Sequence, residues 1–264
     1  MQVFIYNASL TSKGTRALLL TPIFIMMLFF SDLVFSSTQK LDTKSQPFAL
    51  QWAFVHLPPI AFLDKEGRAQ GELAELMNKV SELSGVPYEA FEFPNIRAIS
   101  NLNRHQLNFS IGVKTLVNEM DNFILSRMPV AKMQLQILWN NSATYLNTID
   151  DLSGKRVVLL NGYTYNGMRE KVESLAQSII DVETHNRALA ALKLGRGDYA
   201  LVYKTASEYS MSAMAESGYK SLVIAEVDLY FILDASVPNA QEIMKRLESA
   251  FLDYQTKDLD SLKK

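Results

Sequence analysis

Histidines are the first residues to consider for chemistry at neutral pH, and the chain has three, His56, His105 and His185. General acid–base catalysis needs such a group in a cleft. His105 and His185 fall in helix or turn contexts, where we expect them to be exposed; His56 follows a predicted strand but has no carboxylate at a telling spacing. No HxxxH or HExxH pattern supports a metal site, and Ser110 and Ser126 lack a nucleophile-elbow context. We therefore expect no catalysis and no catalytic metal.

Composition narrows the function classes further. The 264 residues include no cysteine, which excludes disulfides, thiolate metal sites, a cysteine nucleophile and a lipoprotein cysteine. With 26 basic and 28 acidic residues the net charge is −2, so the charge gives no indication of a nucleic-acid partner. No short motif indicates a cofactor.

A different kind of chemistry, ligand binding by a loop, is indicated between residues 161 and 166. The apolar run Arg156 to Leu160 has the length and composition of a central parallel strand, and a helix is predicted after the loop. Such a strand ends at a crevice, where the following helix offers free backbone N–H groups. Tyr163 and Thr164 are therefore candidate ligand contacts, with a polar strand-to-helix turn as the alternative.

The elements around this loop alternate. We expect a helix over 165–177, a strand over 179–182, a second helix over 186–194 and another apolar strand over 199–203. This β-α-β-α-β order is typical of a doubly wound α/β lobe.

The preceding part of the chain predicts another α/β lobe. The helix over 71–84 is amphipathic, with Gly85 in the position of a C′ glycine. The other expected elements are strands over 48–55, 87–93 and 106–113, a small hairpin turning at 64–67, and a helix over 94–102.

Two crossings between these lobes are expected, the first near 130–140 and the return over 223–227. A strand over 229–233 and a helix over 239–254 would complete the first lobe. Two crossings make a hinge, and hinge closure over a ligand is a known way to report occupancy.

The amino end has the pattern of a secretory signal. Lys13 and Arg16 precede a 14-residue apolar run, and Val34 to Ser36 provides a plausible cleavage site. The run is short for a membrane span. We expect a signal peptide over 1–36 and a flexible leader over 37–46, with an uncleaved anchor as the alternative.

Several short motifs, in their order and spacing, give a resemblance. The run "DLSGKRV…NGYTY" is followed about thirty residues later by "ALAALKLGRGDYALVY". Earlier come Gly67 with Gly71-Glu-Leu-Ala-Glu-Leu76, then Asn108-Phe-Ser-Ile-Gly112, and Ser126-Arg-Met-Pro129. Over about Phe48 to Phe251 the chain resembles extracytoplasmic (periplasmic) solute-binding proteins of family 3, the polar amino-acid ABC-transporter type.

The resemblance implies two doubly wound α/β lobes joined by a two-strand hinge, the type II periplasmic-binding-protein architecture. The lobes would comprise 47–130 with 227–264, and 131–226 with the hinge crossings. It implies a monomeric periplasmic protein that captures a small polar solute, an amino acid or a related compound, for an inner-membrane ABC permease. Alternatives are a ligand-sensing partner of a membrane receptor and, less favoured, a lyase of the same fold.

The resemblance also implies where a ligand would lie. Carried over residue by residue, the pocket positions are Trp52, Phe54, His56, Lys114, Thr115, Tyr163, Thr164 and Tyr203. Arg97 and Arg127 are further candidate cationic donors, and their alternative is solvated surface charge. Trp52, Tyr163, Tyr165, Tyr203 and Tyr230 suggest an aromatic-lined pocket for an aromatic, heterocyclic or cationic ligand.

Two departures from the family pattern put an α-amino-acid ligand in doubt. Relatives that bind free amino acids place an arginine shortly before the Ser-x-Pro motif, where it can pair with a carboxylate; here that position holds Glu119 or Met120. They end the last lobe-two strand in an aspartate that neutralises the ammonium group, and here that position is Tyr203.

Overall fold

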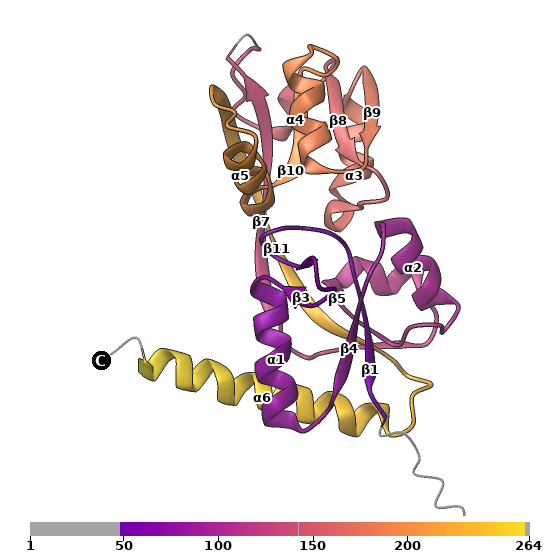
Figure 1. Ribbon diagram of the computed structural model, residues 1–264. Helices are drawn as coiled ribbons and strands as arrows, with labels where there is room; N and C mark the ends of the chain where they lie inside the picture. The colour runs from indigo at the N-terminus through magenta and orange to yellow at the C-terminus, as the bar shows by residue number, and fades with distance from the viewer. Residues whose placement is uncertain (1–47, 142, 262–264) are drawn as a thin grey trace, which may run out of the picture. The chain divides into compact units, whose positions relative to one another are not determined.

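The computed structural model describes residues 48–141 and 143–261 (Figure 1). The expected signal peptide and leader lie outside these residues. Within them, no helix is both long and apolar enough to cross a membrane.

A single mixed sheet runs through the described part of the chain, in the order β4-β1-β5-β11-β7-β10-β8-β9, with β6 also paired to β11. Its first section, lobe one, is built on three parallel strands, β1 (Leu50–Phe54), β4 (Tyr88–Glu92) and β5 (Phe109–Val113). A small hairpin, β2 (Phe62–Leu63) with β3 (Ala69–Gln70), follows β1 as the turn at 64–67 predicts. The remaining strand of lobe one is β6 (Phe123–Leu125).

Alternation along the strands of lobe one places helices on both faces of the sheet. Trp52 and Phe54 pack in the same core cluster as α1 (Glu72–Ser84) and α6 (Ala240–Ser261). Ala53, between them, packs with α2 (Asn95–Asn103) on the opposite face. In Figure 1, α1 and α2 flank the strands from opposite sides. The predicted α/β lobe is therefore confirmed, including the left-handed Gly85 that ends α1.

Two long antiparallel strands carry the chain between the lobes. β7 (Ala131–Asn140) pairs with β11 (Tyr219–Asp234) along almost its whole length. The far end of β11 pairs with β5 in lobe one, whereas β7 pairs with β10 in lobe two. The return crossing and the strand after it, expected as two elements, form one strand with a register shift between Val223 and Ala225.

Lobe two continues the sheet with β8 (Arg156–Leu160), β9 (Ser178–Val182) and β10 (Tyr199–Tyr203), all parallel to one another. α4 (His185–Lys193) covers one face, where Val158 and Ala200 lie; Val172 of α3 (Met168–Leu175) lies in the core cluster of the other face. The described elements also include short 3-10 turns: η1 (Lys114–Glu119), η2 (Ile149–Leu152) and η3 (Tyr165–Gly167).

Two expectations for lobe two were wrong. The helix predicted over 165–177 begins only at Met168, because Tyr165, Asn166 and Gly167 all have positive φ. The helix α5 (Lys204–Ala213) was not predicted. Its buried face consists of Ala206, Ser207 and Ser210, which are too small and polar to produce an apolar period.

The architecture is thus two α/β lobes joined by a two-strand hinge, as expected from the sequence.

Candidate functional site

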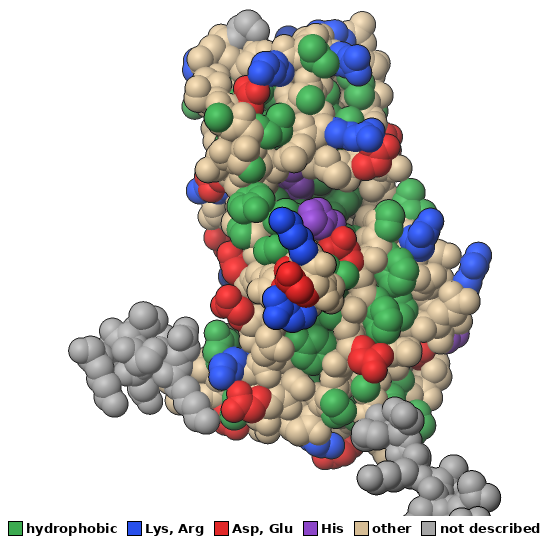
Figure 2. All heavy atoms as spheres, in the orientation of Figure 1, with side chains coloured by type: hydrophobic (Ala, Val, Ile, Leu, Met, Phe, Trp, Pro, Cys, Tyr) green, Lys and Arg blue, Asp and Glu red, His purple; other side chains and the backbone are tan. Residues whose placement is uncertain are grey.

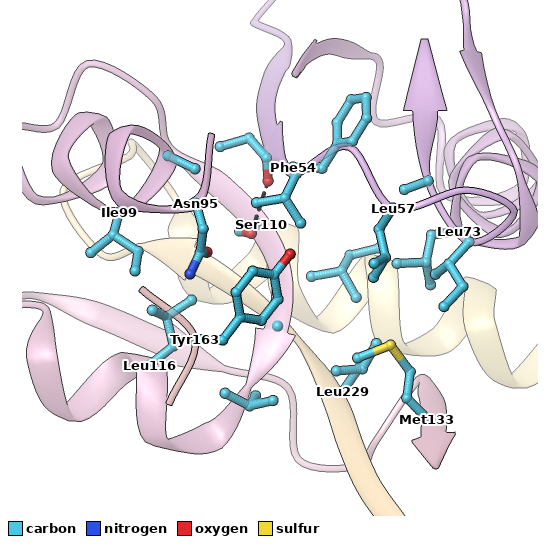
Figure 3. Close-up of a pocket in the computed structure, with 18 of the residues that line it drawn as sticks. Phe54, Leu57, Leu73, Asn95, Ile99, Ser110, Leu116, Met133, Tyr163 and Leu229 are labelled. Carbon is cyan, nitrogen blue, oxygen red and sulfur yellow. Dashed lines mark hydrogen bonds between the residues drawn. The ribbon is translucent and has the colours of Figure 1, made fainter. Parts of the chain in front are cut away.

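A cavity of about 110 Å³ lies where the two lobes meet. Lobe one contributes the end of β1, the first turns of α2 and the end of β5; lobe two contributes residues 162–165 and the end of β10. Met133 and Leu229 come from the hinge strands (Figure 3). The cavity therefore occupies the place at which hinge motion would open or close it.

The wall of this cavity is mainly aliphatic. The described residues that line it include no Asp, Glu, Lys, Arg or His. Its polar side chains are hydroxyls and one amide, those of Asn95, Ser110, Thr164 and the three tyrosines Tyr163, Tyr165 and Tyr203. The aliphatic and alanine residues of the wall are Ala53, Val55, Leu57, Ile60, Ala61, Leu73, Ala98, Ile99, Leu102, Ile111, Val113, Leu116 and Leu229.

The three tyrosines form one cluster, with every pair of ring centroids 5.9 Å apart. The ring of Tyr163 projects into the cavity between Leu116, Leu57 and Leu229 (Figure 3). Burial raises the pKa of all three phenols. These groups therefore stay protonated at neutral pH and serve as hydrogen-bonding groups, not as bases.

Hydrogen-bonding capacity remains at the cavity wall. Within the described residues, Tyr165 Oη accepts the Leu160 N–H at 2.5 Å and Ser110 Oγ donates to the Ala53 carbonyl at 2.9 Å. Among the described residues, the hydroxyls of Tyr163 and Tyr203 have no hydrogen-bond partner. These two hydroxyls can bond a polar atom of a ligand.

The lobe-two loop that carries Tyr163 is held by its own turn and by Arg169. The Tyr163 N–H donates to the Leu160 carbonyl at 3.2 Å, so it is not free for a ligand. Arg169 Nη1 lies 3.1 Å from the Leu160 oxygen and 3.5 Å from the Tyr163 oxygen, and Nη2 pairs with Asp181 at 2.7 Å. The guanidinium of Arg169 therefore holds the loop in place through these bonds.

A direct side-chain hydrogen bond joins the lobes at the cavity. Asn95 Nδ2, at the start of α2, donates to the Gly162 carbonyl at 2.6 Å. Gly162 has φ +75°, and a Cβ there would lie 2.7 Å from Ile96 Cγ1. The two segments are close enough that only glycine fits at this position without displacement.

The sequence-predicted site residues separate into two groups. Tyr163, Thr164 and Tyr203 line the cavity, as does Phe54. Trp52 lies in the core of lobe one beside Phe54 and Tyr88, because alternate residues of β1 face the helices. The rest of the predicted set, His56, Arg97, Lys114, Thr115 and Arg127, is outside the cavity lining.

The positions of these outer residues have local causes. His56 is paired with Glu92 at 3.0 Å, and Arg97 and Lys114 are exposed. Arg127 pairs with the buried Glu248 of α6, with Nη2 to Oε2 at 2.7 Å. Arg127 therefore attaches the segment before the hinge to α6.

His185 was expected to be exposed, and that expectation was wrong. It is 7% exposed, and its Nε2 accepts the Tyr203 N–H at 3.3 Å. Burial lowers the pKa of His185 to about 4. The neutral imidazole thus supports the strand end that presents Tyr203 to the cavity.

Several residues at the site were missed. Asn95, Leu116 and Arg169 were not singled out, because an isolated amide, leucine or arginine carries no local signal. The position of Asn95 directly after Pro94, at a helix start facing the crevice, was the available clue. No group of described acidic, histidine or cysteine side chains could hold a metal ion.

No protein-family model matches the chain, and no curated protein matches it in sequence. Solved structures do match. A histidine kinase sensor domain with similarity to periplasmic binding proteins has a TM-score of 0.67 at 17% identity, covering 81% of this chain and 94% of that one. A histidine-bound substrate-binding protein of an ABC uptake transporter from Streptococcus pneumoniae has 0.66 at 16%, covering 79% and 87%.

A third structure is the ancestral amino-acid-binding protein AncCDT-1, described as a precursor of cyclohexadienyl dehydratase. Its TM-score is 0.63 at 17% identity, covering 79% of this chain and 89% of that one. These likenesses establish the type II periplasmic-binding-protein fold.

Proposed function

We propose that this protein is a periplasmic solute-binding protein that captures one small molecule between its two lobes. The observation that carries the proposal is the cavity itself, which is walled by both lobes and by both hinge strands. A ligand there would contact parts that move relative to each other on hinge bending, so binding and closure would be coupled.

Binding is favoured over catalysis by the chemistry of the wall. A lyase of this fold would need an acid or base in the cleft. The described lining residues offer no carboxylate, imidazole or amine, and burial keeps Tyr163 and Tyr203 protonated. The chain shares its fold with a precursor of a dehydratase, but this likeness is no evidence for an acid or base in the cleft.

The partner that reads the closed form would be an inner-membrane ABC permease, with a membrane sensor as the second candidate. The fold occurs in both settings, in an ABC uptake protein and in a histidine kinase sensor domain. Because the described cavity lining lacks the charged clamp that holds a free amino acid, a membrane sensor is kept as a candidate partner beside the permease. We expect a monomer, with no nucleic acid and no cofactor involved.

A thermal-shift screen of the purified protein tests solute capture. The panel would contain amino acids, polyamines, carboxylates, nucleosides, short peptides and neutral alcohols and phenols. A compound that binds the folded state alone adds about 2.7 kcal/mol of stability at a hundred times its dissociation constant. A rise in the unfolding midpoint with one class is expected; no rise with any class would contradict the proposal.

A further inference from the structure

We infer that the ligand of the interlobe cavity is a small neutral molecule with an apolar body and one or two hydrogen-bonding groups. The inference rests on the proposed solute capture and names its ligand class. It differs from both the polar amino acid and the cationic ligand that the sequence leaves open.

The described cavity wall offers a ligand no charged partner. Moving an ionised carboxylate or ammonium group out of water costs several kcal/mol unless a counter-charge or several hydrogen bonds receive it. None of the described residues lining the cavity is charged. A zwitterion buried there would have both of its charges uncompensated.

No basic residue of the described chain lines the cavity, and on the face drawn in Figure 2 the Lys and Arg side chains are spread over the surface of both lobes. Arg169, behind the Tyr163 loop, is held by Glu173 at 2.7 Å and by Asp181 at 2.7 Å, in addition to the two carbonyls. Arg127 pairs with Glu248. Both guanidiniums are already paired with protein carboxylates, and neither arginine lines the cavity.

The tyrosine cluster does not form a cage for a cation. A cation binds over a ring face, at up to about 6 Å from the centroid. The rings of Tyr163, Tyr165 and Tyr203 are in mutual contact, at 5.9 Å, and leave no space for a cation between them. The rest of the described wall is mostly aliphatic and contains no carboxylate to neutralise a cation.

The size and polar groups of the cavity define the ligand further. At about 110 Å³ it is comparable with the apolar cavity of about 150 Å³ that binds benzene in another protein. Leu57, Ile99 and Leu116 face the space and favour an aliphatic or aromatic body (Figure 3). The phenol hydroxyls of Tyr163 and Tyr203 offer donors and acceptors to a hydroxyl, carbonyl or amide at its polar end.

Two series of compounds with a constant body test the inference by calorimetric titration. The phenol series comprises 4-ethylphenol, tyramine, 4-hydroxyphenylacetate and L-tyrosine. The branched aliphatic series comprises 3-methylbutan-1-ol, 3-methylbutan-1-amine, 3-methylbutanoate and L-leucine. In at least one series the neutral member should bind at least about tenfold tighter than every charged member, since each charge loses its hydration without a partner.

The variants Tyr163→Phe and Tyr145→Phe form a matched pair. Both remove one phenol hydroxyl, but Tyr145 is 59% exposed and outside the cavity lining. Tyr163→Phe should weaken the best neutral compound about three- to tenfold, the effect of one hydrogen bond, and Tyr145→Phe should not.

The titrations distinguish failure of the neutral-ligand inference from failure of the proposed solute capture. Tightest binding by a charged member in both series would overturn the neutral-ligand inference and leave solute capture standing. No binding by either neutral compound would also overturn the inference, and solute capture would then depend on the broader thermal-shift panel. If that panel is also silent, the proposed function falls with it.

Discussion

The side-chain amide of Asn95 reaches from lobe one to the backbone of lobe two, where Nδ2 donates to the Gly162 carbonyl at 2.6 Å. Asn95 is 67 residues from Gly162 in sequence, and both line the cavity. The bond exists only when the lobes are together, so it stabilises the arrangement that encloses the cavity. Hinge closure and cavity formation are thereby linked through one contact.

Substitution of Gly162 by alanine tests this contact. A Cβ would lie 2.7 Å from Ile96 Cγ1, and the left-handed φ of +75° adds about 1–2 kcal/mol of strain. Gly154→Ala is the matched control, because its φ is +70° and no atom lies within 4 Å of the added Cβ. Denaturant unfolding should show similar losses of stability for both variants, whereas calorimetry should show weaker solute binding only for Gly162→Ala. Equal solute affinity in the two variants would separate this contact from closure.

Arg169→Met should destabilise the fold and weaken solute binding. The substitution removes hydrogen bonds to Leu160, Tyr163, Glu173 and Asp181 from a side chain that is 19% exposed, at a cost of about 1–3 kcal/mol.

Arg187→Met is the control for that substitution. The side chain of Arg187 forms an exposed pair with Glu183, and its loss should stay within about 0.5 kcal/mol. Hydrogen exchange would report the Tyr163 loop directly. Unchanged protection of residues 161–167 in Arg169→Met would contradict the claim that Arg169 holds this loop in place.

Arg127 and Glu248 provide a test of a residue selected from sequence as a ligand donor. Arg127 Nε donates to Glu248 Oε2 at 2.8 Å, and its backbone N–H donates to Oε1 at 2.5 Å. Glu248→Ala leaves these donors without an acceptor and should cost about 1–3 kcal/mol of unfolding free energy. Arg127→Ala should leave solute affinity within about twofold. A large loss of affinity in Arg127→Ala would return this residue to the ligand site.

His185 should make stability depend on pH between about 4 and 6.5. Burial lowers its pKa from 6.5 to about 4, so in this window the unfolded chain binds more protons than the folded one. Stability therefore rises with pH through the window, and about 3 kcal/mol of it is lost as the pH falls to 4.

His185→Gln keeps an acceptor for the Tyr203 N–H and should flatten this part of the stability curve, as measured by urea unfolding at several pH values. Equal slopes for the wild type and His185→Gln would show that other groups carry the dependence.

Long apolar strands and amphipathic helices could be predicted because burial on both sheet faces imposes a pattern on the sequence. The bounds of β8 and β10 were correct, and α1 was within one residue. Helix α5 was missed because it buries Ala206 and Ser207, which produce no apolar period. The start of α3 was placed too early because the turn signal of Asn166-Gly167 was read as part of the helix.

The site was predictable only where a loop follows a strand. Tyr163, Thr164 and Tyr203 follow or end strands, so topology alone takes them to the crevice. Asn95 and Leu116 reach the same space through the relation of α2 and η1 to the other lobe, which only tertiary packing determines. Sequence spacing alone does not separate core residues from cavity residues. Trp52 and Phe54 lie on the same face of one strand, yet Trp52 is a core residue and Phe54 lines the cavity.

The central claim, that the interlobe cavity holds the solute, is tested most directly by titrating the best compound of the thermal-shift screen into three proteins. Ile99 lines the cavity, so Ile99→Trp would fill it; Leu194, which is 65% exposed at the end of α4, accepts the matched Leu194→Trp. The account predicts binding by the wild type and by Leu194→Trp with equal affinity, and at least about a hundredfold loss in a folded Ile99→Trp. Equal affinity in all three proteins would place the solute elsewhere and contradict the account.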